Sequence, residues 1–136
     1  MGATTDWQTR RAAATPDAIA PDGSEVRLLC TATGGSMALF TLPPGAVAHA
    51  VAHRTVEELW YVTAGSGRIW RCREDREEIV ALRPGVSISL PVGTTFQFRS
   101  DGTTPLVIVC VTLPPWPGAD EAVPAAGAWA PTDPGA

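Results

Sequence analysis

The sequence predicts an all-β domain, built as an antiparallel sandwich or barrel. From residue 26 to residue 113 the chain consists of short runs rich in β-branched and aromatic residues, divided by glycine and proline. No helical stretch lies between these runs, which argues against alternating strands and helices. With 136 residues, the chain has the size of one domain with its own core.

Each run between two turn signals is an expected strand. Paired turn residues such as Gly34-Gly35 and Pro84-Gly85 separate neighbouring runs and favour sharp reversals of the chain. The expected strands cover residues 26–32, 37–42, 47–53, 58–63, 68–73, 77–82, 86–90, 95–99 and 106–113.

The N-terminal residues 1–24 differ in composition from the β region, being rich in Ala, Thr, Asp and Pro. Two interpretations stay open for them. One is a short helix that Thr5 or Asp6 would cap and Pro16 would end. The other is a flexible arm.

The C-terminal residues 114–136 are dominated by alanine and proline, a composition that builds no core of its own. Trp116 and Trp129 are the side chains that can hold this tail against the domain. The expected organisation is therefore an N-terminal arm, one β domain and a C-terminal tail, over residues 1–24, 25–113 and 114–136.

Composition excludes several classes of function. All ten basic residues are arginine, so a Schiff base on lysine is excluded. The net charge is -4 and the arginines are scattered, which predicts no binding to nucleic acid. No apolar run approaches the roughly 20 residues of a membrane span, so we expect no membrane partner. With His49 and His53 as the only histidines, one chain cannot supply a three-histidine metal site.

The three cysteines, Cys30, Cys72 and Cys110, lie far apart in the sequence. This odd, unclustered set argues against a disulfide framework or a zinc knuckle and is typical of thiols in a reducing compartment. The first residues also lack the apolar core of a signal peptide. We therefore expect a cytoplasmic protein.

The stretch from Gly45 to Gly65 resembles the first motif of the cupin family: Gly, five residues, His, one residue, His, three or four residues, Glu, six residues, Gly. Anchored on Gly45, Glu58 and Gly65, the spacing fits without a gap. The second cupin motif begins with Gly, five residues, Pro, one residue, Gly, and Gly85, Pro91 and Gly93 match it. The resemblance implies a cupin-like jelly roll or antiparallel β-barrel over roughly residues 26–113.

The resemblance also implies four metal-ligand positions, and two of them carry hydrocarbon here. Val51 stands at the first histidine position and Phe96 at the histidine position of the second motif. His53 and Glu58 keep the remaining two positions, while Ser100 stands where the second motif has asparagine. We therefore expect no metal cofactor.

His49 is the one candidate replacement ligand. Residues two apart on a strand face the same side, so His49, Val51 and His53 share a face. His49 and His53 are four residues apart, about 13 Å on an extended strand, so one ion between them needs a bulge. The alternative site is therefore a divalent metal (Fe, Mn, Ni or Zn) on His49, His53 and Glu58; otherwise His49 is a hydrogen-bonded wall residue.

His53 and Glu58 remain together beside apolar neighbours. Desolvation raises the pKa of a carboxyl group and lowers that of an imidazole, while the attraction between the two groups opposes both shifts. A His/Glu pair near neutrality can pass a proton without a metal. The simpler interpretation is a buried polar pair that satisfies itself.

Alternation along the strands predicts the surroundings of this pair. Trp60 follows Glu58 inward, and Phe96 and Phe98 would line the facing strand, unless these rings serve only as core packing. Tyr61, Gln97 and Arg99 would lie on the outer faces, where the resemblance implies pairing into a homodimer.

The leading functional prediction is a metal-independent cupin enzyme that isomerises, cyclises, eliminates or epimerises a small, partly apolar molecule. His53 would be the general base or acid, and Glu58 would orient it or share its proton. The predicted substrate contacts are His49, Val51, Trp60, Phe96 and Phe98. A non-catalytic module that binds or senses a small molecule is the alternative. A metal-dependent oxygenase, with water completing the ligand set, is the second alternative.

Overall fold

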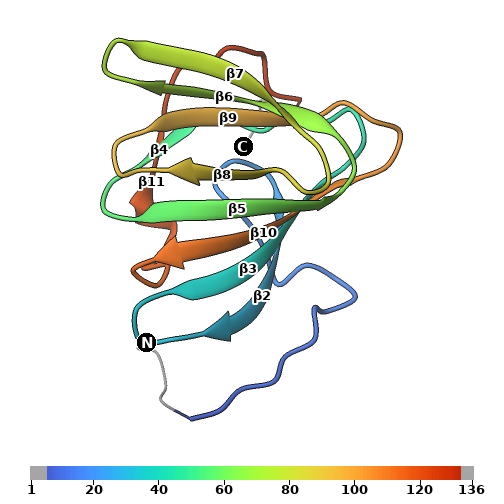
Figure 1. Cartoon of the computed structure of the whole chain (residues 1–136), viewed down its shortest axis with the longest axis vertical. Helices are drawn as coiled ribbons and strands as arrows, with labels where there is room; N and C mark the ends of the chain where they lie inside the picture. Colours follow the sequence, from blue (N-terminus) through green and yellow to red (C-terminus); the bar gives the residue numbers. More distant parts are fainter. Residues whose placement is uncertain (1–5, 133–136) are drawn as a thin grey trace.

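Two antiparallel sheets make up the part of the chain that a computed structural model describes, residues 6–132 (Figure 1). In order across the first sheet, the strands are β1 (Ala18–Ile19), β2 (Glu25–Thr31), β3 (Ser36–Leu42), β10 (Leu106–Leu113), β5 (Glu57–Ala64) and β8 (Ser87–Leu90). Across the second sheet they are β11 (Ala122–Pro124), β4 (Val51–His53), β9 (Thr95–Ser100), β6 (Gly67–Arg73) and β7 (Arg76–Leu82). The predicted all-β, cupin-like jelly roll is confirmed.

The core lies between the sheets and follows the two-residue period of the strands. Along β5, Glu58, Trp60 and Val62 are buried, while the residues between them are exposed. The register of β10 on β5 sets Cys110 opposite Trp60 within the first sheet. Phe96 and Phe98 of β9 join the same apolar cluster from the second sheet. Burying each large apolar side chain of this kind stabilises the fold by roughly 1.5–3 kcal/mol.

The turn between β5 and β6 requires both of its glycines. Gly65 has a φ of 79°, a backbone conformation that side chains disfavour. A Cβ atom on Gly67 would overlap the carbonyl oxygen of Arg99 on the neighbouring strand. The glycine at the end of the first motif is therefore fixed by geometry and lets the chain cross tightly from one sheet to the other.

Most expected strands are present, but the expected strand 47–53 is shorter, since β4 covers only Val51–His53. Just before β4, the backbone amides bond two different parts of the chain instead of one neighbouring strand. Ala48 donates to the carbonyl of Phe98, and His49 donates to the carbonyl of Asp22. Between the Val47–Arg99 bridge and the Val51–Phe96 pair, this segment has one residue more than β9, so the regular alternation is interrupted at His49.

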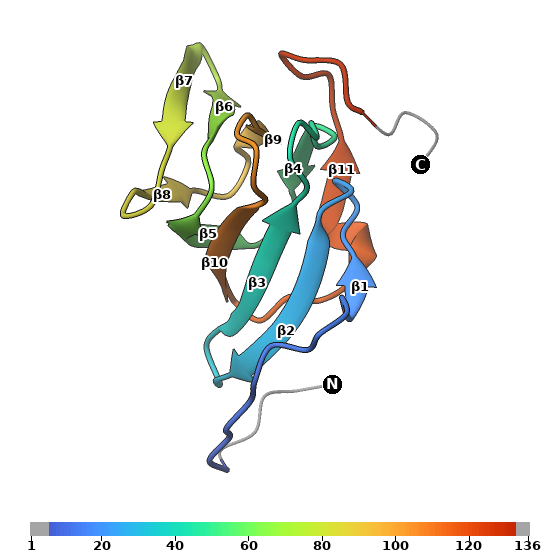
Figure 2. The same ribbon diagram turned by 90° about the vertical axis from the view of Figure 1, so that its right-hand side faces the viewer.

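The short N-terminal helix is wrong for the described residues, because residues 6–17 contain no helical turn; Thr5 lies outside them. This segment runs along β2 instead (Figure 2). The Arg27 guanidinium donates to the carbonyls of Ala13 and Ala14, and Gln8 bonds Thr31. Within residues 6–132, no helix has the length and apolar character that a membrane crossing requires.

The C-terminal tail forms ordered structure on the second sheet (Figure 2). A 3-10 turn at Ala119–Glu121 leads into β11, which pairs with β4 and sets Ala122 opposite His53. The Glu121 carboxylate accepts hydrogen bonds from the Thr55 amide, the Thr55 hydroxyl and the Val56 amide. The tail thus fixes the loop between the strands that carry His53 and Glu58.

The tail also covers the outer face of β9, where Gln97 and Arg99 lie. Gln97 is buried, donates to the carbonyl of Trp129 and accepts from its amide. The guanidinium of Arg99 stacks 5.3 Å from the centre of the Trp129 ring, and that of Arg68 lies 5.7 Å from it. Gln97 and Arg99 thus lie on the outer face of their strand as expected, but the tail covers this face, whereas Tyr61 is exposed.

Replacing Glu121 should show how much the tail stabilises the fold. Glu121→Ala leaves two amides and a hydroxyl without their acceptor, and we expect the free energy of unfolding to fall by about 2–3 kcal/mol. Urea denaturation measures this quantity. The exposed neighbour Asp120 supplies the control: equal stability of Glu121→Ala and Asp120→Ala would contradict this role.

Candidate functional site

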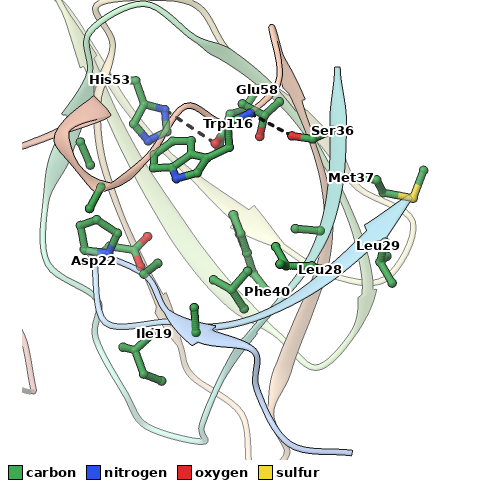
Figure 3. A pocket seen from close by; sticks show the side chains of 18 of the residues that line it. Ile19, Asp22, Leu28, Leu29, Ser36, Met37, Phe40, His53, Glu58 and Trp116 are labelled. Atoms are coloured by element: carbon green, nitrogen blue, oxygen red, sulfur yellow. Dashed lines mark hydrogen bonds and ion pairs between the residues drawn. The ribbon is translucent and has the colours of Figure 1, made fainter. Parts of the chain in front are cut away.

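A cavity of about 340 Å³ opens between the inner faces of β2 and β3 and the side chains of β4, β9 and the tail (Figure 3). This volume is within the range of small-molecule sites. Carbon atoms dominate its walls, with Val26, Leu28 and Phe40 from β2 and β3. His53 and Glu58 lie at one end, next to the Trp116 ring. We call this space the site cavity.

His53 reaches the site cavity because β4 places it two residues after Val51, on the same face. Its ring lies edge-on between Phe96 and Trp116, with centroids 5.2 Å away in both cases. Only 8% of the residue is exposed, and this burial lowers the pKa of His53 to about 4, although the charge of Glu121 opposes the shift. The imidazole is therefore uncharged at neutral pH.

Glu58 projects from β5 toward His53 and is 2% exposed. One carboxyl oxygen, Oε1, accepts a 2.8 Å hydrogen bond from the indole N–H of Trp60. The other, Oε2, lies 3.7 Å from Nδ1 of His53. Burial raises the pKa of Glu58 to about 7, and the hydrogen bond from Trp60 only partly offsets this effect.

His53 and Glu58 therefore do not form an ion pair at neutral pH. A separation of 3.7 Å is too long for a hydrogen bond. The pKa values of both groups move in the direction set by desolvation. A carboxyl group that is half ionised near pH 7 can take or give a proton at physiological pH, and the uncharged imidazole beside it can donate or accept a hydrogen bond.

The structure brings together some of the predicted contact residues and separates others. Val51 and Phe96 line the site cavity with His53 and Glu58, as expected. Trp60 and Phe98 do not line it: their rings pack together in the core, 4.9 Å apart. Trp60 acts on the site from behind its wall, through its hydrogen bond to Glu58 and its edge-to-face contacts with Phe40 and Phe96.

His49 lies outside the site cavity. Its ring approaches Gly23, and its buried Nε2 has no hydrogen-bond partner among the described residues. The prediction that His49, His53 and Glu58 together form an alternative metal site is therefore not supported by their placement. The extra residue before β4, which periodicity does not predict, is the physical reason, because it breaks the two-residue alternation at His49.

Sequence reasoning missed two residues of the site, one acidic and one aromatic. Asp22 lines the site cavity from the loop between β1 and β2, and Trp116 covers His53 from the tail. Both stand in segments interpreted as an arm and a tail. The turn signature Pro21-Asp22-Gly23 was the available signal for Asp22, but a turn signature does not reveal that its carboxyl group is buried.

The donor set does not fit a metal ion. Two of the four positions that cupin motifs use for ligands hold the hydrocarbon side chains of Val51 and Phe96. No group of three His, Cys, Asp or Glu side chains in residues 6–132 is arranged to hold an ion. Protein metal sites of this kind use three or four such donors. His53 and Glu58 alone provide two, and Glu58 is already bonded to Trp60.

Residues 38–112 match the cupin domain family, and the chain belongs to this family. The matched range contains both motifs, with His53 and Glu58, but neither Asp22 nor Trp116. A comparison with curated proteins finds no match.

Several solved structures share the fold. CapF, a capsular polysaccharide assembling protein of Staphylococcus aureus, superposes with a TM-score of 0.64 at 18% identity, over 73% of this chain and 31% of CapF. Oxalate decarboxylase of Bacillus subtilis superposes with a TM-score of 0.63 at 20% identity, over 72% of this chain and 28% of the decarboxylase chain. The CENP-C cupin domain of Drosophila melanogaster superposes with a TM-score of 0.61 at 17% identity, over 67% of this chain and 70% of the CENP-C chain. The chain spans less than a third of the first two proteins, and these likenesses show the fold alone.

The buried carboxyl group predicts a pH-dependent effect of Glu58→Gln on stability. The pKa of Glu58 rises from 4.5 to about 7 on folding, so its ionisation destabilises the folded state as pH increases through this window. At pH 8 we expect Glu58→Gln to exceed the wild type in unfolding free energy by up to about 3 kcal/mol. Near pH 4.5 we expect Glu58→Gln and the wild type to be equally stable. Urea denaturation at several pH values measures the difference.

The exposed neighbour Glu57 gives the matched control. Glu57→Gln should follow the wild type at every pH. A constant difference between Glu58→Gln and the wild type from pH 4.5 to pH 8 would contradict the assigned pKa.

Proposed function

We propose that this cupin is a metal-independent enzyme that moves protons on a small, neutral and largely apolar organic molecule. Isomerisation, cyclisation, elimination and epimerisation are the reactions of this class. The observation that carries the proposal is a carboxyl group with a pKa of about 7 at one end of an apolar cavity. A general base or acid is most effective when its pKa lies near the working pH.

Glu58 is the better proton carrier of the pair. With a pKa of about 4, His53 binds a proton too weakly to hold it at neutral pH. Glu58 changes its ionisation within the physiological range. In this proposal Glu58 takes the proton from the substrate, and the uncharged His53, held between Phe96 and Trp116, hydrogen-bonds a substrate heteroatom.

The charge distribution supports a neutral substrate. Two buried acids, Asp22 and Glu58, line the site cavity. Among the described residues that line it, Arg10 is the one with a permanent positive charge, and Arg10 is exposed. An anionic group would lose its hydration without gaining a buried cation as a partner. The apolar walls of Leu28, Phe40 and Val26 suit a hydrocarbon ring or chain.

A direct test uses 2-tetralone, a neutral bicyclic ketone with acidic protons next to its carbonyl group. In D₂O the wild-type protein should exchange these protons for deuterium faster than buffer alone, as followed by ¹H NMR. We expect Glu58→Gln to slow the catalysed exchange by about 100-fold or more, because general-base catalysis contributes about 10²–10⁴-fold. The catalysed rate should rise with pH up to about 7, since Glu58 must be ionised to act as the base.

Glu57→Gln serves as the control and should retain the wild-type rate. Wild-type exchange by Glu58→Gln would overturn the proposal. Saturable binding of 2-tetralone with no exchange above buffer would instead support the alternative, a non-catalytic binding protein. Formation of a homodimer and a cytoplasmic location stay predictions from the sequence.

A further inference from the structure

Asp22 is a buried acid that neither cupin motif contains. It stands in the loop between β1 and β2, outside the matched residues 38–112. It is 6% exposed and lines the site cavity together with Glu58 and His53. Figure 3 shows the carboxyl group of Asp22 pointing into this cavity from the wall below Trp116. Its burial and direction are those of a functional group rather than of a surface turn residue.

The loop holds Asp22 in a fixed position. The Ser24 amide and hydroxyl donate hydrogen bonds of 2.9 and 2.7 Å to the same oxygen, Oδ1. The Asp22 carbonyl accepts from the His49 amide at 2.8 Å, and Gly23 donates to the Ala20 carbonyl. Since both Ser24 bonds end on Oδ1, Oδ2 is the oxygen that can exchange a proton with a ligand. This positioning precedes any binding step.

Few positive charges offset the burial of the Asp22 carboxylate. Burial raises the pKa of Asp22, and the hydrogen bonds from Ser24 and the nearby His49 oppose this shift only in part. The Asp22 charge in turn helps to raise the pKa of Glu58 and that of Cys110. Two desolvated carboxyl groups that face one cavity avoid carrying two negative charges, so at intermediate pH they hold one proton between them.

We propose that Asp22 is a second catalytic carboxyl group of the site cavity, which protonates the oxygen of a neutral carbonyl substrate while Glu58 removes a proton from the adjacent carbon. This inference rests on the proposed function. It defines the substrate class further, as a compound with an acidic C–H bond next to a carbonyl group. It also assigns a catalytic role to a loop outside the region that the family match covers.

Glu58 and Asp22 share the proposed step, and its protons and electron pairs balance. The Glu58 carboxylate takes the proton from the carbon next to the carbonyl, and the electrons of that C–H bond form the C=C bond of an enol. The carbonyl oxygen takes the proton of the Asp22 carboxylic acid, which becomes a carboxylate. Return of a proton to carbon by Glu58, with transfer of the enol proton back to Asp22, restores both groups. Return to the same carbon gives exchange or epimerisation, and return to a conjugated carbon gives isomerisation.

The test compares Asp22→Asn and the control Asp17→Asn in the exchange of 2-tetralone protons in D₂O. Asparagine keeps an oxygen for the Ser24 bonds but cannot give up a proton, so we expect kcat/KM to fall by about 100-fold. Asp17→Asn makes the same exchange at an exposed aspartate that accepts the Leu28 amide and does not line the site cavity, and it should retain a rate near that of the wild type. Both variants should keep the wild-type circular dichroism spectrum.

The pH profile separates a catalytic role from a structural one. The wild-type rate should rise and then fall with pH, because one carboxyl group must be ionised and the other protonated. Asp22→Asn should lose the falling limb. In the wild-type protein, the ¹³C signal of the Asp22 carboxyl should also titrate above the ordinary aspartate range, a measurement that requires no variant to fold.

Three results decide between the proposals. If Asp22→Asn keeps the wild-type rate and profile while Glu58→Gln loses activity, Asp22 is not catalytic and the proposed function stands. If Asp22→Asn loses activity but keeps both limbs of the wild-type pH profile, the role of Asp22 is structural and this inference is wrong. If Glu58→Gln also exchanges at the wild-type rate, the proposed function itself fails.

Discussion

The burial of Glu58 without a cation partner is the constraint on which the rest of the site depends. Its carboxyl group is 2% exposed, and its hydrogen-bond partners, the side chains of Trp60, Cys110 and Thr112, carry no positive charge. The imidazole of His53, 3.7 Å away, is also uncharged at neutral pH. An ionised carboxylate in these surroundings is destabilising, so the fold keeps the proton on Glu58 up to about pH 7. The same desolvation that costs stability gives this group a pKa suited to proton transfer.

The segments outside the two cupin motifs provide much of this environment. Trp116 covers His53 from the tail, and Glu121 fixes the loop between His53 and Glu58 through hydrogen bonds to Thr55 and Val56. On the other side, the loop with Asp22 forms one wall of the site cavity. The jelly roll thus positions the pair, while the ends of the chain control its exposure to water and its charge. In cupins whose ligand positions hold hydrocarbon, these flanking segments are where further polar groups should be sought.

Glycine spacing and strand periodicity were sufficient to predict the fold, because turns such as Gly65–Gly67 and alternation along β5 are local properties. They also placed Val51 and Phe96 beside His53 and Glu58. They failed where the outcome depends on tertiary contacts. The interruption of the strand at His49 depends on its hydrogen bond to the Asp22 carbonyl, and the position of Trp60 behind Glu58 follows from packing of its ring on Phe98. The burial of Asp22 has no local signature at all.

The central claim is that Glu58 holds its proton to near neutral pH inside the folded domain. Carbon-13 NMR of the protein labelled at the glutamate side-chain carboxyl carbon measures this directly, with Glu58→Gln used to assign the Glu58 signal. We predict that the Glu58 signal titrates with a midpoint near pH 7. A Glu58 midpoint near the ordinary glutamate value of 4.5 would contradict the proposed mechanism at its first step.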